Sequence, residues 1–431
     1  MKNGTGILFF AAFLALHIIT AQIKSGPVIG SVTDTSAIIY VSVRTADTVW
    51  CDLFSDTSYS FLAGKYFCVP RPQFDTSCKI LINNLNAGNY YGYRIYHNSD
   101  TINGYFKTFD FNNAYHFRIA FGSCIGLSDT IFELIATYNP DLTVIIGDWG
   151  YYDFPINSPN MDTFFTDDWN NLMTVYQKRY RLSFPRLANY MRTHPVAWIW
   201  DDHDFVADGS CAYSATYYNT SAIKLDTVPY NPQTKNHARW AYINMFPHYP
   251  LIDTTGGIFQ EVHLPFATTF LIDFRSNKAH FARAFINNNN TWQFLPPPQH
   301  STLGTSQRNW LFNGILNSNS CWKIIFSPDV FNKKLKDIMN LLLSLQSING
   351  QYALAGMAMA EWWIGYPYDQ DTLLYLIQNN GVSGVLVCSG DVHTAAMDDG
   401  ANAGIPEIVA GGLGQQNSML LKTIQQLGQN P

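Results

Sequence analysis

The pattern of apolar and polar positions changes once along the chain. In the first quarter, short runs in which apolar and polar residues alternate are separated by turn residues, as at 37–43, 78–82 and 90–96. None of these runs has a helical period. Regularly spaced strands of this kind are typical of a β-sandwich. We therefore predict a small all-β domain over residues 22–113, with no catalytic constellation of its own.

Residues 114–431 instead alternate continuous apolar runs with stretches of helical period. The predicted strands are 116–121, 142–146, 195–200, 267–273, 321–326 and 385–388. The predicted helices are 129–136, 169–180, 306–316, 333–345 and 371–379. Strands that alternate with helices form parallel sheets, whose ligands bind beyond the carboxyl ends of the strands. This part of the chain is therefore predicted to be an α/β domain with its site at one sheet edge.

Four of the predicted strands are followed by residue types that bind metal ions. The candidates are Cys124 after the first strand, Asp148 and Tyr151 after the second, Asp201, Asp202, His203 and Asp204 after the third, and Asp391 and His393 after the last. Carboxylates crowded at the end of a buried strand are costly unless a cation offsets their charge. Because parallel strand ends meet at one edge, we expect these residues to converge on a metal site.

Each of these residues has a plainer interpretation when it is taken alone. A carboxylate-rich loop can be solvated, and its histidine can be an ordinary surface residue. A cysteine is most often buried or paired, and a tyrosine is most often a core residue with a satisfied hydroxyl. Trp362 and Trp363 either line a substrate cleft or pack in the core. The coincidence of four strand ends is what favours the metal site.

The candidate ligands indicate which ions would bind. A thiolate from Cys124 and a phenolate from Tyr151 suit ferric iron, whereas the carboxylates of Asp202 and Asp391 suit calcium, magnesium, manganese or zinc. Asp148 lies three residues before Tyr151 and is the natural bridging ligand. Two cations about 4 Å apart stabilise both oxygens of a phosphoryl displacement. The sequence therefore predicts a phosphate-ester hydrolase that uses in-line attack by a metal-bound hydroxide, without a covalent serine intermediate.

The N-terminus predicts export. Lys2 precedes an apolar run at 7–16, and polar residues follow from Gln22, which is the pattern of a signal peptide over residues 1–21. The run is too short for a typical transmembrane helix, and an uncleaved anchor is the alternative. We therefore expect a secreted, periplasmic or cell-surface protein, with no transmembrane span once the signal is cleaved.

Composition and charge narrow the expected partners. Charged residues make up 13% and aromatic residues 15% of the chain, which suits an exported protein with a large core. The net charge is -6 and no run of lysine or arginine occurs, so binding to a nucleic-acid backbone is not expected. Among the seven cysteines, Cys68 and Cys78 are the predicted disulfide pair. The expected partners are small phosphate esters.

The ordered motifs resemble those of the alkaline phosphatase D (PhoD-like) metallophosphatases. The resembling segments are 30–37, 121–124, 147–151, 180–181, 199–204, 271–275, 365–367 and 390–393. The runs 85–93 and 104–109 are similar to the last strands of fibronectin type III modules. The resemblance implies a calcineurin-like four-layer α/β core over 114–431 behind an immunoglobulin-like domain. It also implies an iron–calcium centre that cleaves phosphate monoesters and diesters.

The resemblance assigns the metal ligands. Cys124, Asp148 and Tyr151 would bind Fe³⁺, with Asp148 bridging to the second cation. Asp202 and Asp391 would hold that second cation, which is Ca²⁺ in the family and which the ligand types also allow to be Zn²⁺, Mn²⁺ or Mg²⁺.

The resemblance also assigns roles around the metals. His203 and His393 would contact phosphate, bind metal or protonate the leaving oxygen. Arg275 would pair with the phosphate oxygens through its guanidinium group. Asp201 would be either a further ligand or an anchor for one, and the role of Asp204 stays open.

Some positions depart from the family pattern. Asp208 stands where an asparagine is common, Lys278 replaces a frequent second arginine, and Lys2 stands where members often carry a twin-arginine signal. Two alternatives remain: a phosphodiesterase or phospholipase-type hydrolase on the same site, or an inactive cell-surface binding protein that works through its sandwich domain. The inactive protein would be expected to lack some ligands, whereas here every expected ligand position is filled.

Overall fold

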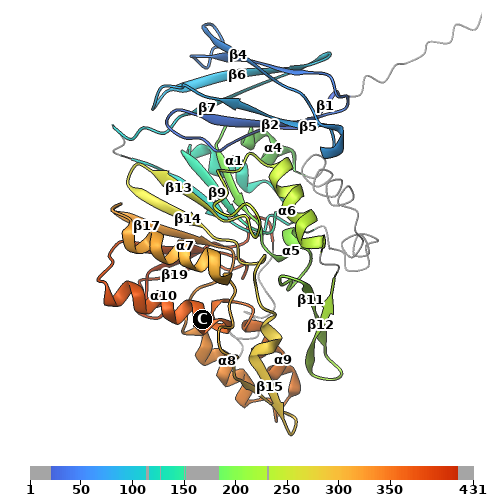
Figure 1. Ribbon diagram of the computed structural model, residues 1–431, viewed down its shortest axis with the longest axis vertical. Coiled ribbons are helices and arrows are strands. Elements are labelled where there is room, and N and C mark those ends of the chain that lie inside the picture. Colours follow the sequence, from blue (N-terminus) through green and yellow to red (C-terminus); the bar gives the residue numbers. More distant parts are fainter. Residues whose placement is uncertain are drawn as a thin grey trace, which may run out of the picture.

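The fold is built from two six-stranded sheets that face each other, with helices on their outer sides (Figure 1). It is seen in a computed structural model that describes residues 21–112, 116–126, 128–149, 151, 184–230 and 233–415. The predicted helix 169–180, the motif at 180–181 and nearly all of the predicted signal peptide lie outside the described residues, as does the predicted boundary between residues 113 and 114.

The first sheet has the strand order β5-β2-β1-β10-β9-β8. Its strands are β1 (Ile23–Gly30), β2 (Ala37–Val43), β5 (Ser77–Ile82), β8 (Ile119–Gly122), β9 (Leu142–Ile146) and β10 (Val196–Ile199). Strands β8, β9, β10 and β1 are parallel, whereas β2 and β5 are antiparallel. Every residue of β9 and β10 is buried, as expected for central strands covered on both faces.

The second sheet has the order β13-β14-β17-β18-β20-β19. Its strands are β13 (Gln260–Leu264), β14 (Ala267–Leu271), β17 (Trp322–Ser327), β18 (Val385–Ser389), β19 (Ala396–Asp398) and β20 (Glu407–Val409). The inner strands β14, β17, β18 and β20 are parallel, and the edge strands β13 and β19 are antiparallel. All six strands predicted for residues 114–431 are present in the two sheets, which confirms the mixed α/β prediction.

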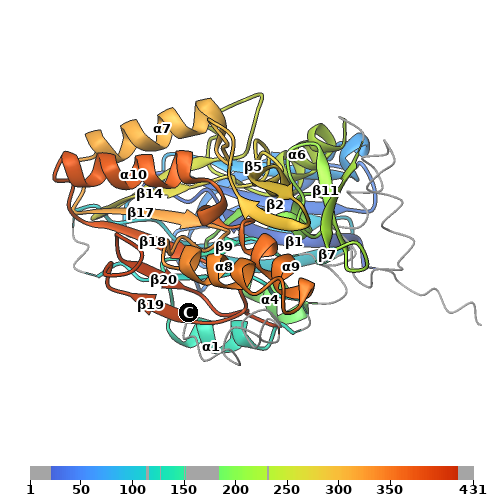
Figure 2. The same cartoon turned by 90° about the horizontal axis from the view of Figure 1, so that it is seen from below.

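Apolar side chains fill the space between the sheets and cover their outer faces. Phe121 of the first sheet meets Phe326 of the second, with ring centroids 5.9 Å apart. Figure 2 shows helices α7 (Gly304–Asn317) and α10 (Pro367–Asn379) outside the second sheet, and α1 (Ile131–Thr137) and α4 (Pro185–Met191) outside the first. Two hydrophobic cores result, one mainly between the sheets and one mainly beneath α7 and α10.

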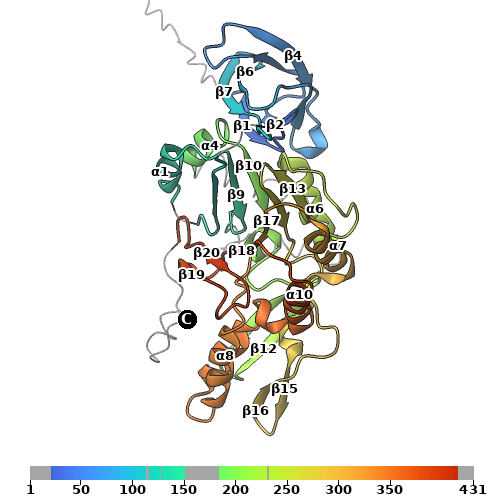
Figure 3. The same cartoon turned by 90° about the vertical axis from the view of Figure 1, so that its left-hand side faces the viewer.

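The N-terminal strands are continuous with this core. A four-stranded sheet, in the order β4-β3-β6-β7, stacks over the β1-β2-β5 side of the first sheet (Figure 3). Its strands are β3 (Val49–Phe54), β4 (Leu62–Cys68), β6 (Tyr90–His97) and β7 (Asp100–Lys107). The predicted disulfide between Cys68 and Cys78 is present. Because β1 pairs with β10, through Gly30 and Val196, the N-terminal strands share a sheet with the α/β part. The immunoglobulin-like or fibronectin-like identity of 22–113 stays a prediction.

The remaining elements connect or flank these strands. They are η1 (Pro72–Phe74), α5 (Asp202–Phe205), the hairpin β11 (Ser214–Asn219) with β12 (Lys224–Pro229), α6 (Gln233–Met245), η3 (Phe281–Ala284), the hairpin β15 (Phe285–Asn288) with β16 (Thr291–Phe294), α8 (Leu335–Ser344), α9 (Gly350–Met359) and η4 (Trp363–Gly365). A search of the described residues finds no helix with the length and hydrophobicity that crossing a membrane requires.

Candidate metal centre

The carboxyl ends of six parallel strands meet at one edge of the facing sheets. The polar residues that follow those strands are Cys124, Asp148 with Tyr151, Asp201 with Asp202 and His203, Arg275, Asp329, and Asp391 with His393. Each of the nine predicted site residues contacts another or shares a potential ligand group with it. Strand ends far apart in sequence therefore converge, as the strand pattern predicts.

The backbone at this edge adopts an uncommon conformation. Cys124, Asp148, Tyr151, Asp391 and His393 have φ angles of 58°, 55°, 35°, 67° and 53°. Non-glycine residues rarely adopt positive φ, and such strain clusters at functional sites because the surrounding structure over-determines it. These left-handed residues follow β8, β9 and β18, where the chain leaves the sheets.

Gly147 makes one of these turns possible. Its φ is +98°, a region that L side chains rarely adopt, and a Cβ atom added there would lie 2.3 Å from the Cβ atom of Asp201. The backbone of β9 can therefore approach the end of β10 closely enough to bring Asp148 beside Asp202.

One half of the cluster joins a thiol, a phenol, a carboxylate and an imidazole. Cys124 Sγ lies 3.4 Å from Asp148 Oδ2, and the Tyr151 hydroxyl donates to the same oxygen at 2.9 Å. The Tyr151 hydroxyl is also 3.0 Å from His393 Nε2. Ligand atoms of Cys124, Asp148 and His393 all lie within 4.8 Å of one another. This is a donor set that a transition-metal ion would take.

The other half is made of carboxylates. Ligand atoms of Asp148, Asp201, Asp202 and Asp391 lie within 4.8 Å of one another, and Asp148 also forms such a group with Asp202 and His203. Asp148 belongs to all the groups that the described residues form at this edge. It is therefore the side chain placed between the two halves.

Neighbouring groups hold the carboxylates in place. The backbone N–H groups of Gly209 and His203 donate to Asp202 at 2.7 and 2.9 Å. The indole N–H of Trp362 donates to Asp391 Oδ2 at 2.7 Å, so this tryptophan, which is only 6% exposed, belongs to both the core and the site. Groups that orient ligands from behind in this way are a usual feature of metal sites.

The buried carboxylates of the cluster would be stabilised by bound cations. Burial raises the pKa of Asp148, Asp201 and Asp391 well above the ordinary aspartate value, and the neighbouring carboxylates raise it further. Burial likewise raises the pKa of the Cys124 thiol. Within the described part of the chain, Asp148 Oδ1 and Asp201 Oδ2 are buried with no hydrogen-bond partner. Oxygen atoms left in this state fit a metal ion as the missing partner.

Asp202 differs from the other carboxylates. Burial acts to raise its pKa, but the nearby Arg275 and His203, together with the Gly209 N–H, lower the pKa overall. Asp202 is therefore ionised and ready to bind a cation.

Arg275 lies at the centre of a buried ion-pair network. Its side chain is 0% exposed. Its Nε donates to Asp201 Oδ1 at 2.5 Å, its Nη2 donates to Asp329 at 2.8 Å, and its Nη1 donates to Glu361. Lys278 Nζ lies 3.0 Å from the second oxygen of Asp329. The guanidinium group thus faces protein carboxylates, and this placement does not match the phosphate contact expected for Arg275.

Asp329 and Glu361 were missed at the sequence level. Asp329 follows β17 by two residues, so the strand-end rule that found the other site residues would also have found it. Glu361 follows α9 with no pattern that marks it, and only the fold brings it to Arg275. Asp204, whose role was left open, caps α5: its side chain accepts the N–H groups of Asp201 and Trp149 at 3.4 and 3.3 Å.

The two histidines both lie near Tyr151. The ring of His203 is 4.3 Å from the Tyr151 ring, measured between centroids, and that of His393 is 6.5 Å away. His203 is 8% exposed, so it sits at the inner wall of the site.

The chain is similar to known phosphatases. A family model described as PhoD-like phosphatase matches residues 119–423. Alkaline phosphatase D of Bacillus subtilis (strain 168) is 23% identical over 316 residues, which cover 66% of this chain and 47% of that protein. The chain therefore spans about half the length of this curated relative.

Solved structures show the same fold. A structure of PhoD, 17% identical, superposes with a TM-score of 0.67 over 92% of this chain and 79% of that one. The purple acid phosphatase PPD1 from yellow lupin (Lupinus luteus) seeds, 12% identical, superposes with a TM-score of 0.53 over 91% of this chain and 66% of that one. The family model extends over most of the chain, from the first strand of the α/β part onward, and the chain belongs to the PhoD-like phosphatase family.

Proposed function

We propose that the protein is a metal-dependent phosphoesterase that hydrolyses phosphate monoesters and diesters at a dinuclear metal centre. The observation that carries this proposal is the position of Asp148. This one buried carboxylate belongs to three overlapping groups of potential ligands, and one of its oxygens has no hydrogen-bond partner in the described part of the chain. A carboxylate between two ligand sets is what a bridged pair of metal ions requires.

The residue types favour a division of the ligands. Cys124, Tyr151 and Asp148 would hold Fe³⁺, because thiolate and phenolate suit a highly charged transition ion. Asp202, Asp391 and Asp148 would hold the second cation, Ca²⁺ or else Zn²⁺, Mn²⁺ or Mg²⁺. When bound, the two ions would neutralise phosphate charge and lower the pKa of water.

The chain's own residues would position the phosphate and move protons. His203 and His393 both lie close to Tyr151 in the ligand cluster, so an ester oxygen bound beside them could receive a proton from one of these imidazoles. Such general acid help is typically worth about 10²–10⁴ in rate.

Arg275 would act as a positioning residue. Its buried guanidinium fixes one oxygen of Asp201 and leaves the other, Oδ2, directed at the cluster without a partner among the described residues. Asp201 would thereby be either a ligand of the second cation or the group that orients Asp202, and Arg275 would act through it.

The test of the metal assignment is metal analysis together with a visible spectrum. A phenolate bound to ferric iron absorbs visible light, so the purified enzyme should be coloured and contain iron. Tyr151→Phe should remove the visible band. Tyr138→Phe, an exposed tyrosine on the surface beside α1, is the matched control and should keep it. An active, colourless, iron-free protein, or a band that survives Tyr151→Phe, would refute the assignment.

Two companion assays test the rest of the proposal. Comparing kcat/KM for phenyl phosphate and diphenyl phosphate measures the preference between monoesters and diesters. A metal-loaded protein that cleaves neither ester would instead fit the inactive binding protein.

Export is proposed from the apolar run at 7–16, and N-terminal sequencing of the mature protein should find a start near residue 22.

A further inference from the structure

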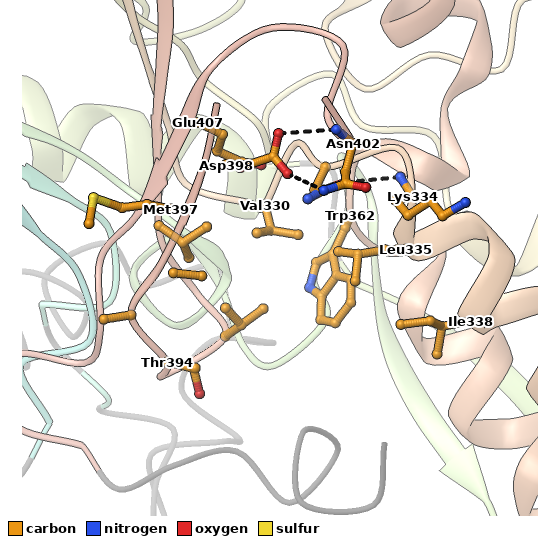
Figure 4. Close-up of a pocket in the computed structure, with 15 residues that line it drawn as sticks. Val330, Lys334, Leu335, Ile338, Trp362, Thr394, Met397, Asp398, Asn402 and Glu407 are labelled. Carbon is orange, nitrogen blue, oxygen red and sulfur yellow. Dashed lines mark hydrogen bonds between the residues drawn. The ribbon is translucent and has the colours of Figure 1, made fainter. Parts of the chain in front are cut away.

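A cavity of about 490 Å³ lies beside the candidate metal centre. It is bounded by the start of α8, by the chain that follows β18, and by β19 and β20. Figure 4 shows the indole of Trp362 in the middle of this cavity, with Leu335 and Ile338 on one side and Thr394 on the other. The volume lies within the range of pockets that bind small organic ligands.

The cavity and the metal centre share a wall. The ring of Trp362 lines the cavity, while its indole N–H donates to Asp391 Oδ2 at 2.7 Å. Val392 and Thr394, which flank His393 in the sequence, also line the cavity. A group bonded to a phosphate at the metal centre would therefore lie beside this cavity.

The walls of the cavity select an apolar group. Val330, Leu335, Ile338, Trp362 and Val392 line it with aliphatic and aromatic side chains. Such walls gain free energy from excluding water and provide no hydrogen bonds to a charged group.

Most charged groups at the cavity have partners within the protein, whereas Glu407 Oε2 has none among the described residues. Lys334 Nζ lies 2.8 Å from Asp337. The two oxygens of Asp398 accept the Gly400 N–H and the Asn402 side-chain amide, both at 2.8 Å, and Figure 4 shows Asp398 and Asn402 together at the rim. Glu407 is 1% exposed and accepts from the Ser389 hydroxyl and the Phe331 N–H. Lys334 is the only cation among the described residues that line the cavity, which argues against a doubly phosphorylated or nucleotide-like group.

We propose that this cavity binds the alcohol part of the phosphate ester, and that the preferred substrates are phosphate esters of large apolar alcohols. The proposal rests on the proposed phosphoesterase function and names its substrate class. Aryl and alkyl groups are both apolar, so either could fill the cavity.

Three esters of similar leaving-group acidity test the proposal: phenyl phosphate, β-naphthyl phosphate and para-hexylphenyl phosphate. The cavity predicts a kcat/KM at least about tenfold higher for one or both of the larger esters, because each added apolar group enters a dry pocket. A gain with the naphthyl ester alone identifies an aryl site, and a gain with the hexylphenyl ester alone identifies a chain site. Equal values for all three would overturn the proposal.

Variants then localise the effect. Ala396→Trp places a bulky side chain in the cavity from an exposed position on β19 and should lower kcat/KM for the two larger esters by a greater factor than for phenyl phosphate, which removes the preference. Ala401→Trp, also exposed but outside the lining, is the matched control and should keep the preference. If Ala396→Trp slows all three esters by the same factor, the cavity does not select the alcohol.

Binding without turnover separates the two proposals. Calorimetric titration of the metal-loaded protein with methylphosphonate and with naphthylmethylphosphonate compares the binding of a small and a large apolar group. Tighter binding of the naphthyl compound, lost in Ala396→Trp, supports the cavity even if no ester is hydrolysed, in which case only the proposed function fails. Equal affinities for the two phosphonates overturn the cavity proposal even if the esters are cleaved.

Discussion

Several residues of the candidate site have strained backbone conformations. Five residues at the strand ends have positive φ, and each such conformation costs on the order of 1–3 kcal/mol unless the rest of the fold enforces it. The carboxylates add a second cost, because burial raises the pKa of Asp148, Asp201 and Asp391 and so opposes their ionisation. The backbone strain and the burial of carboxylates both occur at residues that would bind metal. Stability is therefore lost at the candidate site.

Gly147 tests how tightly this geometry is set. Gly147→Ala should lose metal and at least about 100-fold in activity, because the new Cβ would lie 2.3 Å from the Asp201 Cβ and push β9 from β10. The control is Gly381→Ala, which has a φ of +60° and nothing within 4 Å of the added atom. It should cost about 1–2 kcal/mol of stability, from its backbone conformation alone, and keep full activity. Metal content and kcat distinguish the two variants, and an active, metal-replete Gly147→Ala would show that the close approach is not required.

The individual strands carry most of what could be predicted from sequence. Largely apolar runs such as 142–146 are recognisable because both of their faces are buried, and the polar residues that follow such runs mark the site. Helix α9 was missed because it contains two glycines and is apolar on nearly every side, so it has no clear helical period. The partners of Arg275 were missed for a different reason. Ion pairs between segments more than 50 residues apart leave no local pattern in the chain.

Strand β20 contributes a titrating group that ties three elements together. Glu407 accepts from Ser389 of β18 and from the Phe331 N–H after β17, and burial raises its pKa from 4.5 to about 7. A carboxyl group whose folded pKa is raised stabilises the fold below its unfolded pKa, and that contribution is lost as pH rises through the folded pKa. The protein should therefore lose up to about 3 kcal/mol from this group between pH 4.5 and pH 7.

Glu407→Gln should weaken this pH dependence, because the amide keeps an acceptor oxygen but cannot ionise. Thermal unfolding at pH 5 and pH 8, at matched metal content, should show a smaller drop in Tm for the variant than for the original protein. Glu133→Gln, at a position where the side chain is 68% exposed, should leave the pH profile unchanged. Identical profiles for Glu407→Gln and the original protein would mean that Glu407 is ionised throughout.

At the scale of the whole molecule, the N-terminal strands and the α/β part share one sheet and one hydrophobic core. Their buried side chains belong to one continuous core, and β1 extends the parallel sheet that carries Cys124, Asp148 and Asp202. The alternating pattern of residues 22–113 predicted the strands but could not predict this pairing, because periodicity determines which face of a strand is buried and not which strand lies beside it. The alternating pattern of residues 22–113 would be the same whether they formed an accessory domain or extended the sheet of the α/β part.

Gly30, at the junction of β1 and β10, distinguishes these two descriptions. A Cβ atom there would lie 2.5 Å from the Pro247 carbonyl oxygen and 2.8 Å from that of Val196, so Gly30→Ala should force β1 away from the sheet and cost about 1–3 kcal/mol. Gly64→Ala, on the edge strand β4, meets only the ring of Tyr66 and is the control with little expected effect. If the protein is one body, Gly30→Ala should lower the Tm in a single transition and weaken metal retention with it. Two separate transitions, with the metal-retaining one unshifted, would instead identify residues 22–113 as an independent domain.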